Sequence, residues 1–148
     1  MNISLKDLII TGSFNGVRVG DTADSVEAML GEPTDWSLPS KERAARLGVW
    51  KYGPIELHFV ESALAMIFCD DIEGIQAKHD RVVVDPWIVT PSLTVETAGA
   101  ALDAIGVAYE RGQRAELPDR SSLRVESGVS LSFSLPETAG TLLNLVVS

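Results

Sequence analysis

The sequence predicts an α+β protein in which two tandem, pseudo-symmetric units each pack a helix on an antiparallel β-meander. Two observations indicate this class. Segments with the helical period precede segments in which apolar and polar residues alternate, as they do in half-buried strands. The same order of segments then occurs twice along the 148 residues. We expect residues 1–74 to form the first unit, residues 75–148 to form the second, and both to share one compact structural domain.

The first unit is expected to open with a short helix and a short strand. Apolar residues recur at helical spacing over residues 5–10, and Gly12 can end a helix there. Residues 17–19 then place two valines on either side of an arginine, which favours a brief strand.

A second helix follows in the first unit. Asp21 or Thr22 can cap its start, and Gly31 and Pro33 are stop signals at its end. The helical period places three apolar residues on one face, which we expect to be buried: Val26, Met29 and Leu30.

Strand signals dominate the rest of the first unit. Residues 34–48 are expected to form a loop with one polar helical turn. After it, turn-forming pairs at residues 53–54 and 61–62 separate three strands, which predicts an antiparallel meander. The middle strand has a buried face of Ile55, Leu57 and Phe59 and a polar face of Glu56 and His58.

The second unit repeats this plan. A brief strand is expected over residues 87–89, followed by a helix over residues 94–105 with Leu102 and Ile105 facing inward and Gly106 as its cap. A polar loop is expected over residues 110–120. Three strands then close the unit, with the following signals: Leu123 and Val125; Val129, Leu131, Phe133 and Leu135 alternating with Ser130, Ser132 and Ser134; and residues 142–147.

Regular spacing supports a duplication. Corresponding residues are 75 or 74 positions apart: Gly31 and Gly106, Gly53 and Gly128, Leu57 and Leu131. One helix on a short sheet would bury little apolar area alone, so each unit gains by pairing with its copy.

The run GVRVGDTADSVEAMLGEPTDW followed by VWKYGPIELHFVESALAMIFCDD resembles the helix-plus-meander unit of the small outer-membrane lipoprotein A family and of β-lactamase-inhibitor-like proteins. Two such units in tandem are the arrangement of the inhibitor proteins. The layout is also similar to that of an uncharacterised family of bacterial cytoplasmic proteins. The resemblance implies a protein-binding scaffold whose open sheet face meets the partner. The quoted motifs are structural, so they support the fold and not a function.

Composition excludes several classes of function. The net charge is −9, which disfavours nucleic acid and anionic membranes and favours a basic or neutral partner protein. One cysteine, Cys69, cannot form an intramolecular disulfide, which is compatible with a reducing compartment. The first residues lack the pattern of a signal peptide, and no apolar run approaches the roughly 20 residues of a membrane span. We therefore expect a cytoplasmic protein.

Catalytic and metal-binding patterns are weak. Cys69 ends an apolar strand and precedes two aspartates, where a thiol is more often an inert hydrophobic side chain than a nucleophile. The acidic segment 70–85 contains His79 but matches no calcium or zinc spacing, and turn-forming aspartates explain it equally well. We expect no cofactor, no metal and no enzymatic activity.

Binding to an unidentified protein partner is the leading hypothesis, with an immunity-type or regulatory inhibitor as one form of it. A small-ligand or metal-binding protein and a weak enzyme are the alternatives, and the oligomeric state is left open. Trp36 and Trp87 lie in polar contexts, where each either plugs an end of the core, the reading we favour, or contacts a partner. Trp50 and Tyr52 are interpreted as core. The candidate partner-binding residues are Trp36, Trp87, Glu56, His58, Ser130, Ser132 and Ser134.

Overall fold

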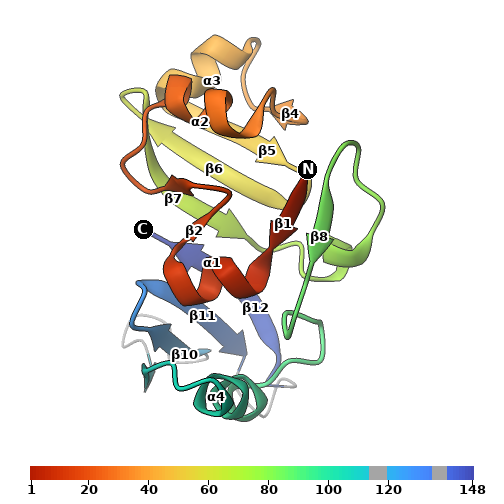
Figure 1. Ribbon diagram of the computed structural model, residues 1–148, viewed down its shortest axis with the longest axis vertical. Coiled ribbons are helices and arrows are strands. Elements are labelled where there is room, and N and C mark those ends of the chain that lie inside the picture. Colours follow the sequence, from red (N-terminus) through yellow and green to blue (C-terminus); the bar gives the residue numbers. More distant parts are fainter. Residues whose placement is uncertain (114–119, 135–139) are drawn as a thin grey trace.

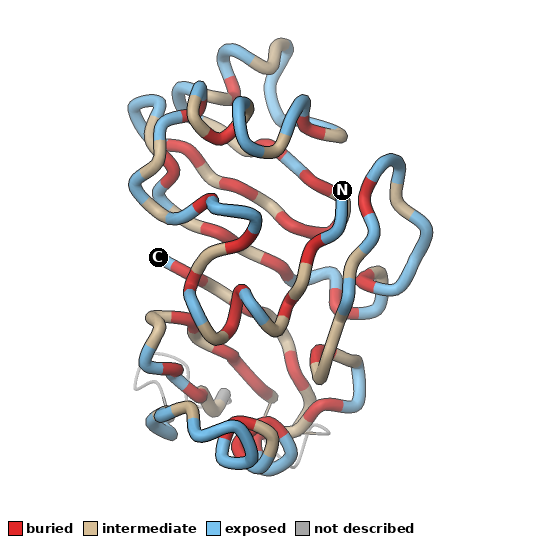
Figure 2. The backbone as a smooth tube through the Cα atoms, viewed as in Figure 1, coloured by how far each residue is buried: buried red, intermediate tan, exposed pale blue. Residues whose placement is uncertain are grey.

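An antiparallel sheet dominates the computed structural model, which describes residues 1–113, 120–134 and 140–148. Within these residues the sheet has eight strands in the order β4-β5-β6-β7-β12-β11-β10-β9. Helices α1 and α2 lie in front of its strands in Figure 1, and α4 lies at the bottom of the view, below β10 and β11. The buried residues alternate along the strands in Figure 2, as expected for a sheet with one face on the core. The predicted α+β class with antiparallel strands is confirmed.

The elements of the first half come in this order: β1 (Asn2–Ser4), α1 (Leu5–Thr11), β2 (Ser13–Phe14), β3 (Val17–Arg18), α2 (Ala23–Leu30), β4 (Asp35–Trp36), α3 (Lys41–Leu47), β5 (Gly48–Tyr52), β6 (Ile55–Val60) and β7 (Ala63–Cys69). A short 3₁₀ helix, η1 (Glu73–Gln76), leads into the second half. Its elements are β8 (Val83–Asp85), α4 (Val95–Ala104), β9 (Tyr109–Gln113), β10 (Arg120–Val125), β11 (Val129–Ser134) and β12 (Leu142–Val147).

Helix α1 forms where the sequence predicts it. The Ser4 side chain accepts a hydrogen bond from the Asp7 backbone N–H, which caps the start of the helix. Gly12 ends it with a φ of 72°, a left-handed conformation that glycine adopts without strain. The buried face consists of Leu5, Leu8 and Ile9.

Helix α2 confirms the predicted cap and corrects one residue of the predicted buried face. Thr22 is the cap, and its side chain accepts a hydrogen bond from the Ser25 N–H. Val26 is buried, but Met29 is 42% exposed. The stripe that faces the sheet runs through Ala23, Val26 and Leu30, because residues three and four apart share a face. Met29 falls outside this stripe.

The segment predicted as a loop contains more structure than expected. Asp35 and Trp36 form β4 at the edge of the sheet, and α3 has seven residues where one polar turn was expected. Ser40 caps α3 by accepting a hydrogen bond from the Arg43 N–H. The only buried residue of α3 is Ala44, so the helix has almost no apolar stripe by which its sequence could be identified.

The first predicted meander is confirmed. Strands β5, β6 and β7 pair in succession and antiparallel. Trp50 and Tyr52 are buried, as expected for core residues, and so are Ile55, Leu57 and Phe59 of β6.

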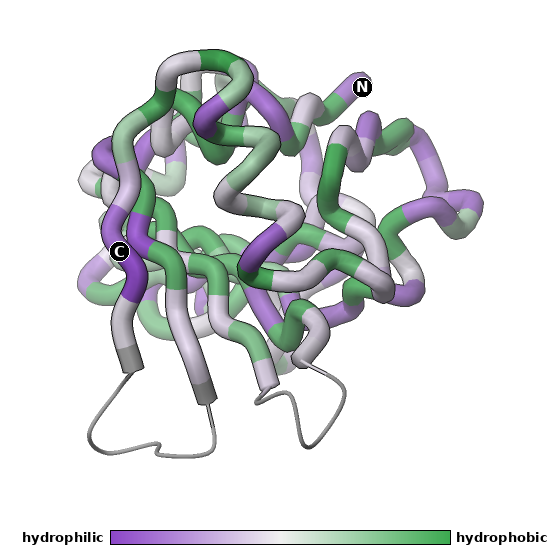
Figure 3. The backbone as a smooth tube through the Cα atoms, turned by 90° about the horizontal axis from the view of Figure 1, so that it is seen from below, coloured by the Kyte–Doolittle hydropathy of each residue, from purple (hydrophilic) through white to green (hydrophobic). Residues whose placement is uncertain are grey.

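The strand predicted over residues 87–89 is wrong. The strand of this region is β8, which pairs in parallel with β1. Trp87 has a φ of 51°, and the Val89 N–H donates to the Pro86 carbonyl, which makes residues 86–89 a turn. The segment before β8 projects at the right of Figure 1, and its hydrophilic residues lie at the right margin of Figure 3.

Helix α4 ends before one of the residues predicted to face inward. Thr94 and Thr97 form a reciprocal capping box at its start, and Leu102 is fully buried as expected. Ile105 is 40% exposed. It follows the last helical residue, and Gly106 then turns the chain with a φ of 73°, so the helical period no longer directs Ile105 to the core.

The second meander has one strand more than expected. Residues 110–113 belong to β9, the edge strand of the sheet, and Arg120 begins β10, where a polar loop was predicted. Residues 114–119 and Leu135 lie outside the described residues. The antiparallel order of β10, β11 and β12 is confirmed.

The two halves meet where β7 pairs antiparallel with β12. Phe68 lies opposite Val146 at the centre, and the flanking pairs are Ile67 with Val147 and Cys69 with Leu145. The halves also interlock elsewhere, because β1 pairs with β8 and the Ser127 hydroxyl donates to the Ile9 carbonyl at 2.6 Å.

Two local details occur in both halves, while the pseudo-symmetry of the two units stays a prediction. The threonines that cap α2 and α4 each form an isolated antiparallel bridge: Thr22 with Ala63, the first residue of β7, and Thr94 with Thr141, the residue before β12. Each central hairpin also contains an irregularity at the same place, after His58 and after Ser132.

Candidate functional site

One face of the sheet carries no described helix, and we call it the open face. The Tyr52 hydroxyl donates to the Gly31 carbonyl after α2, and the Trp50 indole N–H donates to the Lys41 carbonyl of α3. These contacts place α2 and α3 on the Trp50 side. Residues directly opposite one another on neighbouring strands share a face. The register therefore defines one row across the other side: Lys51, Glu56, Phe68, Val146, Ser130 and Arg124.

Glu56 connects two basic groups on the open face. Its Oε1 lies 3.1 Å from Lys51 Nζ, and its Oε2 lies 3.0 Å from His58 Nε2. The His58 ring also meets the Phe68 ring edge-on, with centroids 5.9 Å apart. Ion pairs at this exposure contribute about 0–1 kcal/mol each, so this cluster does not explain the fold. It presents a nearly neutral polar surface.

An apolar stripe runs beside this cluster. Leu47 is 67% exposed and Val60 is 50% exposed, and the two pair through an isolated bridge at the corner of the sheet. The stripe continues across β5, β7 and β12 through half-buried side chains: Val49, Met66, Phe68 and Val146. Sequence reasoning missed these residues. Val60 continues the alternation of Glu56 and His58, which is a signal that could have identified it.

The three candidate serines are not equivalent. Ser130 and Ser134 are half-buried, whereas Ser132 is buried with 6% exposure opposite Asn144. The smooth polar surface expected from the alternation is therefore interrupted at Ser132. The accessible part of the open face is centred on the first-half strands and on Ser130.

The candidate tryptophans lie away from the open face. Trp36 is opposite Trp50 in the β4–β5 pair, so it lies on the side of the sheet that the helices cover, and it is 38% exposed at the edge. The interpretation of Trp36 as a core plug is therefore wrong. Trp87 packs half-buried against the core, with Lys6 Nζ 5.7 Å from its ring centroid. Neither tryptophan joins Glu56 or His58.

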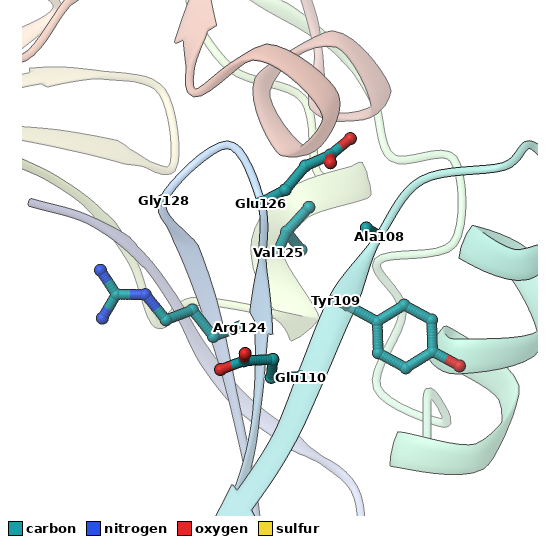
Figure 4. A pocket seen from close by; sticks show the side chains of 7 residues that line it. All are labelled: Ala108, Tyr109, Glu110, Arg124, Val125, Glu126 and Gly128. Carbon is teal, nitrogen blue, oxygen red and sulfur yellow. The ribbon is translucent and has the colours of Figure 1, made fainter.

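A shallow pocket of about 400 Å³ lies where β9 begins and β10 ends. Figure 4 shows Arg124 and Glu110 pointing to one side of this ribbon and Tyr109 pointing to the other. Arg124 and Glu110 are directly opposite in the strand pair. Arg124 and Glu110 thus continue the open face toward the edge of the sheet, and Glu126 adds a second carboxylate to the pocket.

Cys69 has the environment of a structural thiol. Burial, followed by the nearby carboxylates of Asp70 and Asp71, raises the pKa of its thiol from 9.0 to about 12. A nucleophilic cysteine needs a lowered pKa and an exposed sulfur. Cys69 is 1% exposed.

The acidic segment between the halves is explained by turns. Asp71 Oδ1 accepts a hydrogen bond from the Gly74 N–H, and His79 Nε2 lies 2.8 Å from the Gly74 carbonyl. Across residues 1–113, 120–134 and 140–148, no group of three or more His, Cys, Asp or Glu side chains is arranged to hold a metal ion. In the same ranges no helix is long and apolar enough to cross a membrane.

Comparison with known proteins gives one distant structural likeness. No family model and no curated protein sequence matches the chain. A crystal structure of an extracellular protein containing an SCP domain, from Bacillus anthracis str. Ames, matches with a TM-score of 0.40 and 13% sequence identity. The match covers 86% of this chain and 43% of that one, so the chain spans less than half the length of the structure it resembles.

Proposed function

We propose that this protein is a non-enzymatic protein-binding module that holds its partner against the open face. The observation that carries the proposal is the apolar stripe, in which Leu47 and Val60 are at least half exposed beside the polar Lys51–Glu56–His58 cluster. Exposed apolar patches with polar rims are typical of protein interaction sites.

Charge supports a protein partner that is basic or neutral. The whole chain carries −9, which repels phosphate backbones and anionic membranes over long range. At the centre of the open face, Lys51 compensates the charge of Glu56, and His58 Nε2 lies 3.0 Å from Glu56 Oε2. A partner that meets this surface therefore does not bury an uncompensated carboxylate. An immunity-type or regulatory inhibitor, which masks its partner, is the form of binding that we propose.

We also propose a cytoplasmic location. The protein does not need an oxidising compartment to fold, because its single cysteine is buried and forms no disulfide. Immunoblotting of fractionated source cells tests this, and recovery of the protein from the envelope or medium fraction would contradict it.

Affinity capture from the source cell tests the binding proposal. A bait with Leu47→Lys and Val60→Lys places two charges on the apolar stripe without touching the core. The matched control bait, Met29→Lys and Ile105→Lys, adds the same two charges at exposed apolar residues outside the stripe. We expect the unaltered and control baits to capture a stoichiometric partner and the stripe variant to lose it. Equal capture by all three baits, or no stoichiometric partner, would contradict the proposal.

A further inference from the structure

We propose that the hollow between α2 and α3 binds an aliphatic primary ammonium group, such as the end of a lysine side chain. The hollow lies on the helix-covered side of the sheet, so it is independent of the open face. Its volume is about 560 Å³, and small-molecule sites are typically about 300–1,000 Å³. Figure 1 shows α2 and α3 as neighbours over β5 and β6.

The floor of the hollow is apolar and is built from small side chains. Ala23 and Ala45 come from α2 and α3, and they leave space that larger residues would fill. Trp50 also lines the hollow and is held in place because its indole N–H donates to the Lys41 carbonyl at 3.0 Å. Such a floor favours the methylene groups of a ligand, because their burial removes apolar surface from water.

Of the two cations at the rim, Lys41 is paired with a carboxylate, whereas Arg46 forms no ion pair within the described residues. Lys41 forms an ion pair with Glu27, and the hydrogen bond between them raises the pKa of Lys41. Arg46 follows Glu42 by four residues on α3, the spacing at which opposite charges on a helix attract each other.

Two further carboxylates at the rim, those of Asp24 and Glu61, are exposed. Neither forms an ion pair within the part of the chain that the structure describes. The rim thus has an excess of negative charge above an apolar floor. An ammonium group on an aliphatic stem complements both features at once.

Titration with n-butylammonium chloride, followed by NMR of the indole N–H groups, tests the inference, with sodium chloride as the salt control. We expect the Trp50 signal to move and saturate while the signals of Trp36 and Trp87 stay in place. No saturable movement of the Trp50 signal, or equal movement of all three, would overturn the proposal.

Variants of the hollow test which of its residues bind the ammonium group. Asp24→Asn with Glu61→Gln removes two rim carboxylates and should weaken binding about tenfold. The matched control, Asp70→Asn with Glu73→Gln, changes the net charge equally outside the hollow and should leave binding within about twofold. Ala45→Leu fills the hollow and should abolish binding. Equal weakening by both charge pairs would overturn the proposal.

The source of the ammonium group is settled by a second titration with Nα-acetyl-lysine methylamide. Saturable movement of the Trp50 signal by this compound supports a lysine side chain of a partner as the natural ligand. Movement by n-butylammonium alone supports a free aliphatic amine. Because none of these variants alters the apolar stripe, failure here leaves the binding role of the open face standing, and failure of the open face leaves this site standing.

Discussion

At the scale of single residues, burial decides what Cys69 can do. Its sulfur lies on the core face of β7 with 1% exposure, and burial is the largest cause of its raised pKa. The thiolate, which is the reactive form of cysteine, is therefore disfavoured at neutral pH. The same burial makes Cys69 a contributor to stability that depends on pH.

The raised pKa of Cys69 predicts the direction in which the stability of the protein changes with pH. In the unfolded chain the thiol titrates near its ordinary value of 9.0, and in the folded chain it titrates near 12. The stability that Cys69 contributes is therefore complete below pH 9.0 and is lost as the pH rises toward 12. Urea unfolding of the wild type and of Cys69→Ala over this window should show a wild-type stability that falls faster, by up to about 1.4 kcal/mol per pH unit. Parallel slopes for the two proteins would contradict this.

At the scale of elements, the helices depend on their caps because they are short. Helix α4 has ten residues, and isolated helices of that length are marginal in water. Its capping box satisfies the backbone N–H of Thr97 with the Thr94 side chain, and the backbone N–H of Thr94 with the Thr97 side chain. These bonds use donors that the helix itself leaves unpaired.

Loss of this cap should be measurable. Thr94→Ala removes the side-chain acceptor and should lower the free energy of unfolding by about 1 kcal/mol. Thr94→Ser keeps a hydroxyl at the same position and should lower it by less than half of that amount. Chemical unfolding of both variants beside the wild type gives the comparison. An alanine variant as stable as the serine variant would show that the capping box is unimportant.

Elements with a clear periodic spacing of apolar residues could be predicted from the sequence. Elements that form through contacts distant in sequence could not. The meander of β5 to β7 has alternating apolar residues, and α1 has both an apolar stripe and an end signal at Gly12. In contrast, β8 exists because it pairs with β1 about 80 residues earlier. Strand β9 is a polar edge strand with no apolar face to predict it.

The candidate site was predictable in part for the same reason. Alternation placed Glu56 and His58 on the face opposite the core, and the register confirms that placement. The exposure of Leu47 follows from its bridge to Val60, a contact that no local pattern indicates. Trp36 was predicted to plug the core and is instead an exposed residue, because its two-residue strand β4 forms an edge of the sheet.

At the scale of the whole molecule, the two sides of the sheet have different roles. The helix-covered side holds one continuous core cluster that includes residues from α1, α2, α4 and both meanders. The open face joins the halves through β7 and β12, so its apolar stripe crosses from the first half into the second. A partner that covers the stripe would therefore contact both halves at once.

NMR of labelled methionine methyl groups tests this central claim most directly. Met66 lies opposite His58 on the open face, whereas Met29 is 42% exposed on α2. When the captured partner is added, the account predicts that the Met66 methyl signal shifts and saturates at one equivalent while the Met29 signal stays in place. A shift of Met29 with no shift of Met66 would contradict binding at the open face.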